Sequence, residues 1–161
     1  MYRGKKMKVN ISDVIECIEF ENENLNHYYN KNTGIIIYKE SSETANYSAA
    51  DYNRINEFEE WERELIESLY DLENNPDNYI KLPGEEEISE LNMMINFCNS
   101  FNDFSIDEIV NKNTDDIKKV QKIKKLIEEK NMLNDWYDFR EQTEKQIAID
   151  WCNKNNIEYI E

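Results

Sequence analysis

Histidine, cysteine and glycine, on which many enzyme and cofactor sites depend, are scarce in this sequence. His27 is the only histidine, so any Ser-His-Asp or Cys-His arrangement would have to use it, and it falls in a β-favouring run. Cys17, Cys98 and Cys152 are far apart and form no CxxC, which indicates reduced, buried thiols. The three glycines are too dispersed for a phosphate-cradling loop. We expect no catalytic residues, no cofactor and no metal.

Carboxylates, in contrast, are abundant. The chain has 35 Asp and Glu against 19 Lys and Arg, a net charge of −16. Paired carboxylates can run glycoside hydrolysis or hold Mg²⁺ or Ca²⁺, but no pair stands out and there is no Asp-x-Asp-x-Asp loop. A charge of this sign repels nucleic acid and anionic membranes and attracts basic surfaces.

The densest acidic segment coincides with a predicted amphipathic helix over residues 54–72. Its expected inward face recurs at three- and four-residue steps and consists of Ile55, Phe58, Trp61, Leu65, Leu69 and Leu72. The expected partner-binding face, continued in the next helix, consists of Glu57, Glu60, Glu64, Glu67, Asp71, Glu85, Glu86 and Glu87. A row of carboxylates can imitate the phosphates of duplex DNA, which carry about one charge per 1.7 Å. The alternative is a solvated face that keeps the protein in solution.

A basic surface is expected on a helix capped by Thr114. Its inward face would consist of Ile117, Val120, Ile123 and Ile127. Its basic patch consists of Lys118, Lys119, Lys122, Lys124 and Lys125. These lysines could form a solvated, salt-bridging face, contact phosphates, or dock onto an acidic patch.

Further elements follow from local signals. Ser12 is expected to cap a short helix through Phe20, and Ser105 another short helix. Two strands, 27–29 and 35–38, flank a turn at Gly34, which predicts a hairpin. We also expect helices over 85–99, with Glu85–Glu87 in its first turn, and over 134–153, and short strands over 79–82 and 157–160. The aromatic residues expected in the core are Trp61, Phe97, Trp136, Phe139 and Trp151.

These elements predict one α+β domain over residues 1–161: a small N-terminal antiparallel hairpin or sheet packed against four to six helices. Residues 1–8 form a basic tail, 9–52 the helix and hairpin part, and 53–161 the mainly helical part. No stretch approaches the roughly 20 apolar residues of a membrane helix, and no apolar signal core follows the N-terminus. We expect a cytoplasmic protein, bacterial or, if phage-encoded, in the host cytoplasm.

The second half of the chain carries a family resemblance. Tyr79-Ile80-Lys81-Leu82-Pro83, Met93-Met94-Ile95-Asn96-Phe97, and Asp135-Trp136-Tyr137-Asp138-Phe139-Arg140 with Trp151 closing resemble Uncharacterised Protein Family 0158. These are small bacterial proteins of similar length, and the hairpin with Asn32-Thr33-Gly34 suits their N-terminal part. One departure is residues 113–125, where the family shows a Gly and an aromatic-basic run and this chain has lysines without Phe. The resemblance implies a fold and a bacterial or phage source, and supplies no site.

From charge and the missing catalytic apparatus we expect a non-enzymatic, acidic protein-interaction protein. It would inhibit a basic, nucleic-acid-handling partner by occupying its nucleic-acid-binding surface, as immunity proteins, antitoxins and phage anti-defence (anti-CRISPR) proteins do. The alternative is a bacterial regulatory module that contacts nucleic acid through the Lys118–Lys125 helix. An enzyme that uses carboxylates or a bound metal is the third interpretation, and the oligomeric state stays open.

Overall fold

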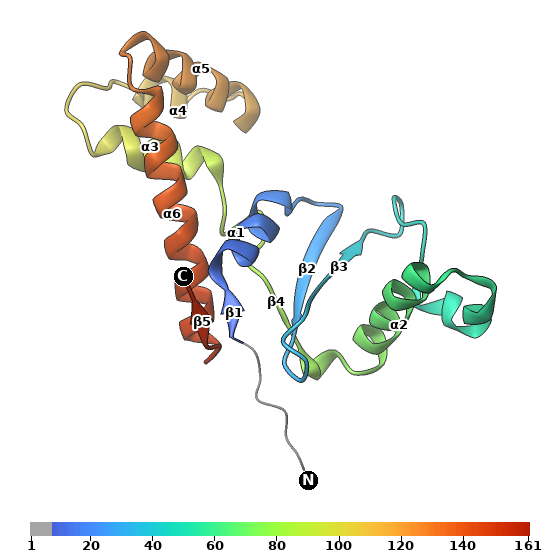
Figure 1. The fold of residues 1–161 in the computed structure, drawn as a ribbon. Helices are drawn as coiled ribbons and strands as arrows, with labels where there is room; N and C mark the ends of the chain where they lie inside the picture. Colours follow the sequence, from blue (N-terminus) through green and yellow to red (C-terminus); the bar gives the residue numbers. More distant parts are fainter. Residues whose placement is uncertain (1–7) are drawn as a thin grey trace. The chain divides into compact units, whose positions relative to one another are not determined.

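A computed structural model describes residues 8–161, so residues 1–7 of the predicted basic tail lie outside the described part. The described residues contain helices and short strands in the α+β composition predicted from the sequence (Figure 1). They form two compact units. Unit 1 comprises the chain up to Glu85 together with Ala148–Glu161, and unit 2 comprises Glu86–Ile147.

Unit 1 is built around a three-stranded antiparallel sheet in the order β3-β2-β4. Its strands are β2 (Leu25–Asn30), β3 (Ile36–Glu40) and β4 (Tyr79–Lys81). The predicted hairpin is confirmed: Gly34 takes a φ of 77° in the turn, and its N–H donates to the Asn30 carbonyl at 2.8 Å. In β2 the side chains of His27 and Tyr29 are buried, as alternate residues of a strand with one covered face must be.

Two short strands join the beginning and the end of the described chain. The elements are β1 (Val9–Asn10), β5 (Tyr159–Ile160) and α1 (Ile11–Phe20). β1 and β5 pair in parallel, with Val9 opposite Tyr159, which confirms the end of the predicted strand over 157–160. The N-cap of α1 is Asn10, whose side chain accepts the Ser12 N–H at 3.0 Å, so the predicted Ser12 cap is wrong by two residues.

The last helix, α6 (Leu133–Lys154), contributes its end to unit 1. Trp151 is buried there, its Nε1–H donates to the Lys81 carbonyl of β4 at 3.0 Å, and its ring meets Tyr29 edge-on at 6.0 Å. The expected core role of Trp151 is therefore confirmed. An indole that packs and also donates a hydrogen bond fixes the helix end to the sheet.

The predicted helix over residues 54–72 is wrong in its first third. The chain there forms a 3-10 helix, η1 (Ala49–Glu57), and then α2 (Glu60–Asn74). Arg54 has a non-helical backbone (φ −128°, ψ 33°) and Phe58 is extended, so one α-helix does not run through both. α2 starts again at a capping box, in which the Glu59 N–H donates to the Glu62 carboxylate at 2.7 Å.

The buried face of α2 consists of Ile66, Leu69 and Leu72, while the expected inward residues Ile55, Phe58 and Leu65 are half-buried. The core role expected for Trp61 is wrong, because its side chain is 60% exposed. At about 100° per residue, Trp61 lies only about 20° from Leu72 around the helix, so its exposure comes from its place in the first turn and not from its direction. Ile66, which the predicted periodicity missed, is fully buried.

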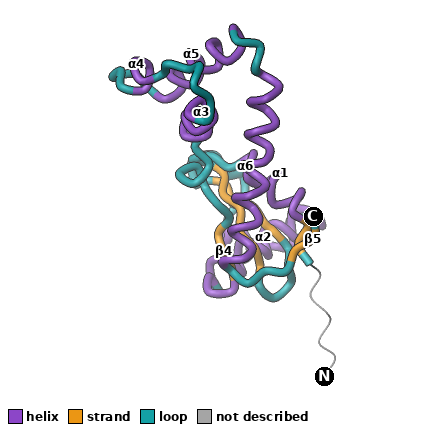
Figure 2. The backbone as a smooth tube through the Cα atoms, turned by 90° about the vertical axis from the view of Figure 1, so that its left-hand side faces the viewer, coloured by secondary structure: helices purple, strands orange, loops and turns teal. Residues whose placement is uncertain are grey.

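Unit 2 is a small helical bundle (Figure 2). It contains α3 (Glu90–Asn99), α4 (Asp107–Val110), α5 (Asp116–Glu129) and the first part of α6. Its core consists of Met93, Met94, Phe97, Cys98, Ile106, Ile123, Ile127 and Trp136. The rings of Phe97 and Trp136 meet at 5.7 Å, and Phe139 packs against both, so the expected aromatic core of this region is confirmed.

Three helix starts in unit 2 differ from the prediction. α3 begins at Glu90, where Ser89 accepts the Asn92 N–H at 3.2 Å, and not at Glu85. α4 is preceded by Ile106 and not capped by Ser105, and α5 is capped by Asp115 and not by Thr114. The inward placement of Ile117 is also wrong, since it lies in the first turn of α5 and is 71% exposed.

Candidate functional site

The exposed face of α2 carries a row of carboxylates. Glu60, Glu64 and Glu67 recur at steps of four and three residues, which places them on one side of the helix, and all three are exposed. We call these three residues the acidic ridge. In the described part of the chain none of them forms an ion pair or a side-chain hydrogen bond to another side chain. Their charges therefore face solvent.

The other residues of the predicted acidic face do not join the ridge. Glu57 lies on η1, 3.7 Å from the Arg54 guanidinium. Asp71 is half-buried and accepts the Tyr79 hydroxyl at 2.5 Å and the Asn75 amide at 2.8 Å. Glu85, Glu86 and Glu87 are exposed in the turn before α3, outside any helix, so the predicted helix-dipole stabilisation is wrong for them.

An aromatic group that the sequence did not indicate as a surface lies beside the ridge. The ring of Tyr47 meets Phe58 and Trp61 edge-on, each at 6.1 Å, and its hydroxyl donates to Glu62 at 2.9 Å. That hydrogen bond is the largest cause that raises the pKa of Tyr47. Trp61 also donates its Nε1–H to Glu59 at 3.3 Å. Tryptophan is over-represented where proteins bind one another, and Trp61 is exposed beside the acidic ridge.

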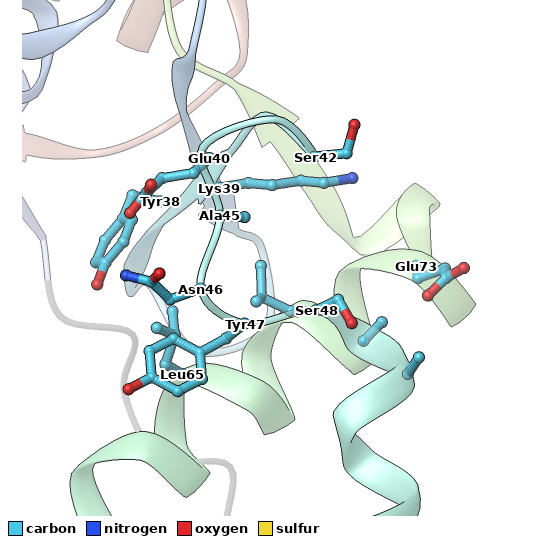
Figure 3. Close-up of a pocket in the computed structure, with 13 residues that line it drawn as sticks. Tyr38, Lys39, Glu40, Ser42, Ala45, Asn46, Tyr47, Ser48, Leu65 and Glu73 are labelled. Atoms are coloured by element: carbon cyan, nitrogen blue, oxygen red, sulfur yellow. The ribbon is translucent and has the colours of Figure 1, made fainter.

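A cavity of about 330 Å³ lies on the other side of α2, between this helix, β3 and the loop that leads to η1. Figure 3 shows the side chains of Tyr38, Asn46, Tyr47 and Leu65 around it, with Lys39 and Glu73 near its rim. The lining mixes apolar side chains with hydroxyls, an amide and charges of both signs. This volume is at the lower end for small-molecule sites, and no described group of catalytic residues converges on it.

The lysines of α5 are displayed as predicted. Lys118, Lys122, Lys124 and Lys125 are exposed and Lys119 is half-buried. Lys124 Nζ lies 5.8 Å from the centre of the Tyr137 ring on α6, which is within cation–π range. Among residues 8–161 no ion pair involves any of the five, so the expected salt-bridging face is not formed.

His27 is a buried strand residue. Its Nδ1 lies 3.0 Å from Glu21 Oε1, and its backbone N–H donates to the same oxygen at 2.6 Å. Its ring therefore contacts a carboxylate that also holds the backbone, and no described serine or cysteine side chain bonds to it. Within the described residues no cluster of three or more His, Cys, Asp or Glu could hold a metal ion.

Burial disfavours the thiolate form of all three cysteines. Burial raises the pKa of Cys17, Cys98 and Cys152 to about 11 in each case, and neighbouring carboxylates add to the shift at Cys17. A nucleophilic or metal-binding cysteine needs the thiolate, which a pKa of about 11 makes rare at neutral pH. Cys98 and Cys152 are buried as predicted, whereas the predicted burial of Cys17 is wrong, because its side chain is only half-buried.

Comparison with known families identifies the chain. The model of the uncharacterised protein family UPF0158 matches residues 5–161. The chain belongs to this family. The match covers both units, including Tyr79–Pro83 and Asp135–Arg140, on which the sequence resemblance depended. No curated protein and no solved structure gives a significant match.

The family adds no site to those described above, because its description names no activity. The described helices include none that is long and apolar enough to cross a membrane.

Proposed function

We propose that this member of the family is a non-enzymatic, acidic protein-interaction protein. Its partner is a basic, nucleic-acid-handling protein, and binding occupies the surface with which that partner holds nucleic acid. Inhibitors of nuclease toxins and of host defence nucleases work in this way, and we place the protein in the cytoplasm of a bacterium or, if phage-encoded, of its host.

The observation that carries the proposal is the acidic ridge. Three carboxylates at about 5–6 Å intervals stand unpaired on a rigid helix and repeat the negative charge of a nucleic-acid backbone. Lysines and arginines of a partner could bind these three carboxylates without breaking an existing ion pair. Trp61, 60% exposed at the end of the ridge, supplies the apolar contact that charge alone lacks.

The chemistry of the described side chains supports a role without catalysis. His27 is buried against Glu21, and the thiols of Cys17, Cys98 and Cys152 have raised pKa values. A general base or nucleophile works best with a pKa near the operating pH and an open path to substrate. The three thiols lack such a pKa, and the side chain of His27 is buried.

The test uses the tagged chain as bait in a lysate of the source organism, washed at rising salt. We expect the bait to retain a basic protein. This protein should elute as the salt concentration rises, because exposed charges are screened beyond about 10 Å at 0.1 M. The retained protein, once purified, should release its nucleic acid when the chain is added. A retained protein that binds the chain and nucleic acid at the same time would overturn the proposal.

Charge reversal locates the surface. Glu60→Lys, Glu64→Lys and Glu67→Lys in one protein should weaken partner binding at least tenfold, because three attractive contacts become repulsive. The matched control reverses three exposed glutamates, Glu16 and Glu19 on α1 and Glu23 in the turn after it, and makes the same change in net charge. Equal loss in both variants would show that only net charge matters and not the ridge.

One observation favours a second function, contact of α5 with nucleic acid. Its lysines form no ion pair in the described structure, and one of them, Lys124, lies over the Tyr137 ring. Lysines that lie beside an aromatic ring are typical of proteins that bind single-stranded nucleic acid. The net charge of −16 opposes it. Replacing Lys118, Lys122 and Lys125 by Gln should abolish binding of a labelled oligonucleotide at low salt if this is correct, and no binding by the unmodified chain excludes it.

A further inference from the structure

The acidic ridge has a counterpart of opposite charge in the same chain. Lys118, Lys122 and Lys125 are exposed on α5 and, like the ridge, make no ion pair among the described residues. We call these three residues the lysine face. Each set therefore lacks a partner of the other sign within its own unit.

The two sets have the same spacing. In each, the second residue follows the first by four positions and the third follows the second by three. Both lie on regular α-helix, so each row is about 10 Å long at 1.5 Å per residue. Laid side by side in parallel, the helices bring Glu60 opposite Lys118, Glu64 opposite Lys122 and Glu67 opposite Lys125. In the antiparallel arrangement the steps of four and three residues no longer coincide.

An exposed apolar side chain flanks each row at the same end. Trp61 follows Glu60 and is 60% exposed, and Ile117 precedes Lys118 and is 71% exposed. One residue turns the helix by about 100°, so Trp61 lies to one side of its row and Ile117 to the opposite side of its own. When two parallel helices face one another these sides coincide, and Trp61 meets Ile117 at the level of the first ion pair.

From this match in charge, spacing and apolar flank, we infer that the lysine face of one copy of the chain docks on the acidic ridge of a second copy. The inference rests on the proposed function in one respect: the second copy covers the surface that the basic partner uses. Self-association therefore regulates that surface, since a partner has to displace the docked α5. Exposed ion pairs are individually weak, so the expected dissociation constant is on the order of 100 µM.

The experiment is sedimentation velocity on the full chain, from about 10 µM to about 1 mM protein in about 0.1 M salt. At that ionic strength the long-range repulsion between two acidic copies is largely screened, whereas pairs in direct contact are not. The mean mass should rise above that of the monomer with concentration and fall back to it at about 1 M salt. A monomer throughout overturns the inference.

Charge exchange makes the test specific. One variant carries Glu60→Lys, Glu64→Lys and Glu67→Lys, and the other Lys118→Glu, Lys122→Glu and Lys125→Glu. Each alone should stay monomeric, because like charges then face each other. An equimolar mixture should associate again, since the basic α2 of the first accepts the acidic α5 of the second. A folding defect would not be repaired by mixing, and a mixture that stays monomeric overturns the pairing.

The control with Glu16→Lys, Glu19→Lys and Glu23→Lys should associate as the unmodified chain does. Trp61→Ala and Ile117→Ala should each weaken association about threefold without abolishing the salt dependence, because one small apolar contact is removed. A labelled oligonucleotide that binds the lysine face of a chain that never self-associates would assign this face to nucleic acid and overturn the inference.

A nona-arginine peptide separates the two proposals. If the chain stays monomeric but binds the peptide through the acidic ridge, the proposed function stands and the self-docking fails. If the chain self-associates but the peptide and the captured basic protein leave the ridge unoccupied, the proposed function fails and the self-docking stands. If both are correct, the peptide should dissociate the oligomer as it binds.

Discussion

Burial decides what the cysteines of this chain can do. Each thiol has its pKa raised to about 11, with burial as the largest cause, although Cys17 is only half-buried and Cys98 and Cys152 are fully enclosed. The thiolate is the reactive form, so at pH 8 the thiolate fraction is on the order of one in a thousand. Burial in the fold therefore disfavours the nucleophilic thiolate form of all three cysteines.

We predict that the native protein reacts slowly with a thiol reagent at pH 8. The rate per thiol should be about a hundredfold below that of the unfolded chain in denaturant, because burial limits both ionisation and access. Replacing Cys17 by Ala identifies the fastest of the three, since Cys17 alone is partly accessible. A native thiol that reacts as fast as a free cysteine would reveal an activated residue and reopen a catalytic role.

The Tyr79–Asp71 hydrogen bond gives a second prediction at this scale. Burial, followed by the Asp71 carboxylate, raises the pKa of Tyr79 to about 12 from 10. A raised pKa in the folded state means that the stabilisation is complete below pH 10 and is lost as the pH rises towards 12. Tyr79→Phe should lower the free energy of unfolding by about 1 kcal/mol at pH 8. In chemical denaturation, the difference between the two proteins should shrink between pH 10 and 12, and a constant difference would contradict the assignment.

At the scale of the elements, helix caps decide where the helices begin. The Asp115 carboxylate accepts the Lys118 N–H at 2.8 Å and so caps α5, the helix that displays the lysines. Asp115→Ala should destabilise unit 2 by about 1 kcal/mol, measured by denaturation, since one backbone donor loses its partner. Asp115→Asn keeps the acceptor and should cost only a small part of this. Equal losses would show that the charge, and not the cap, is what matters.

The sequence predicts local elements well where one residue determines the backbone. The hairpin was predictable because Gly34 can take positive φ between two β-favouring runs. The end of α2 at Asn74 follows from Pro76, which has no amide hydrogen to continue the helix. The aromatic core of unit 2 was predictable because Trp136 and Phe139 fall on a helical period.

Other features depend on contacts that a periodic pattern does not contain. The extended backbone at Phe58 separates Glu57 from the acidic ridge, although nothing in the local pattern distinguishes it from helix. Trp61 and Ile117 fit the inward period, yet each lies in a first turn and stays exposed. The parallel pairing of β1 with β5 joins residues about 150 positions apart and has no local signal. The predicted acidic face is therefore divided between the ridge and separate carboxylates, and the exposure of Trp61 beside the ridge had no signal in the sequence.

At the scale of the whole molecule, net charge bears on both stability and the proposed interaction. A net charge of −16 leaves acidic side chains in large excess over basic ones. Among the described residues, Arg54 pairs with Asp51 and Glu57, and Arg140 pairs with Glu90 and Glu144. This excess of negative charge destabilises the folded state, because folding brings like charges closer together than they are in the unfolded chain. Under the proposed function, the same unbalanced charge leaves the acidic ridge open to a basic partner.

Salt should consequently stabilise the protein. Raising NaCl from about 20 to about 200 mM shortens the Debye length from roughly 20 to 7 Å and weakens the repulsion, so the melting temperature should rise by roughly 3 °C, equivalent to about 1 kcal/mol. KCl should act equally, which separates screening from binding of a particular ion. Replacing Glu60, Glu64 and Glu67 by Gln should raise the melting temperature at low salt and reduce its dependence on salt. A melting temperature that falls with salt would show that attractive pairs outweigh repulsion, and the acidic ridge would then already be satisfied within the fold and closed to a basic partner.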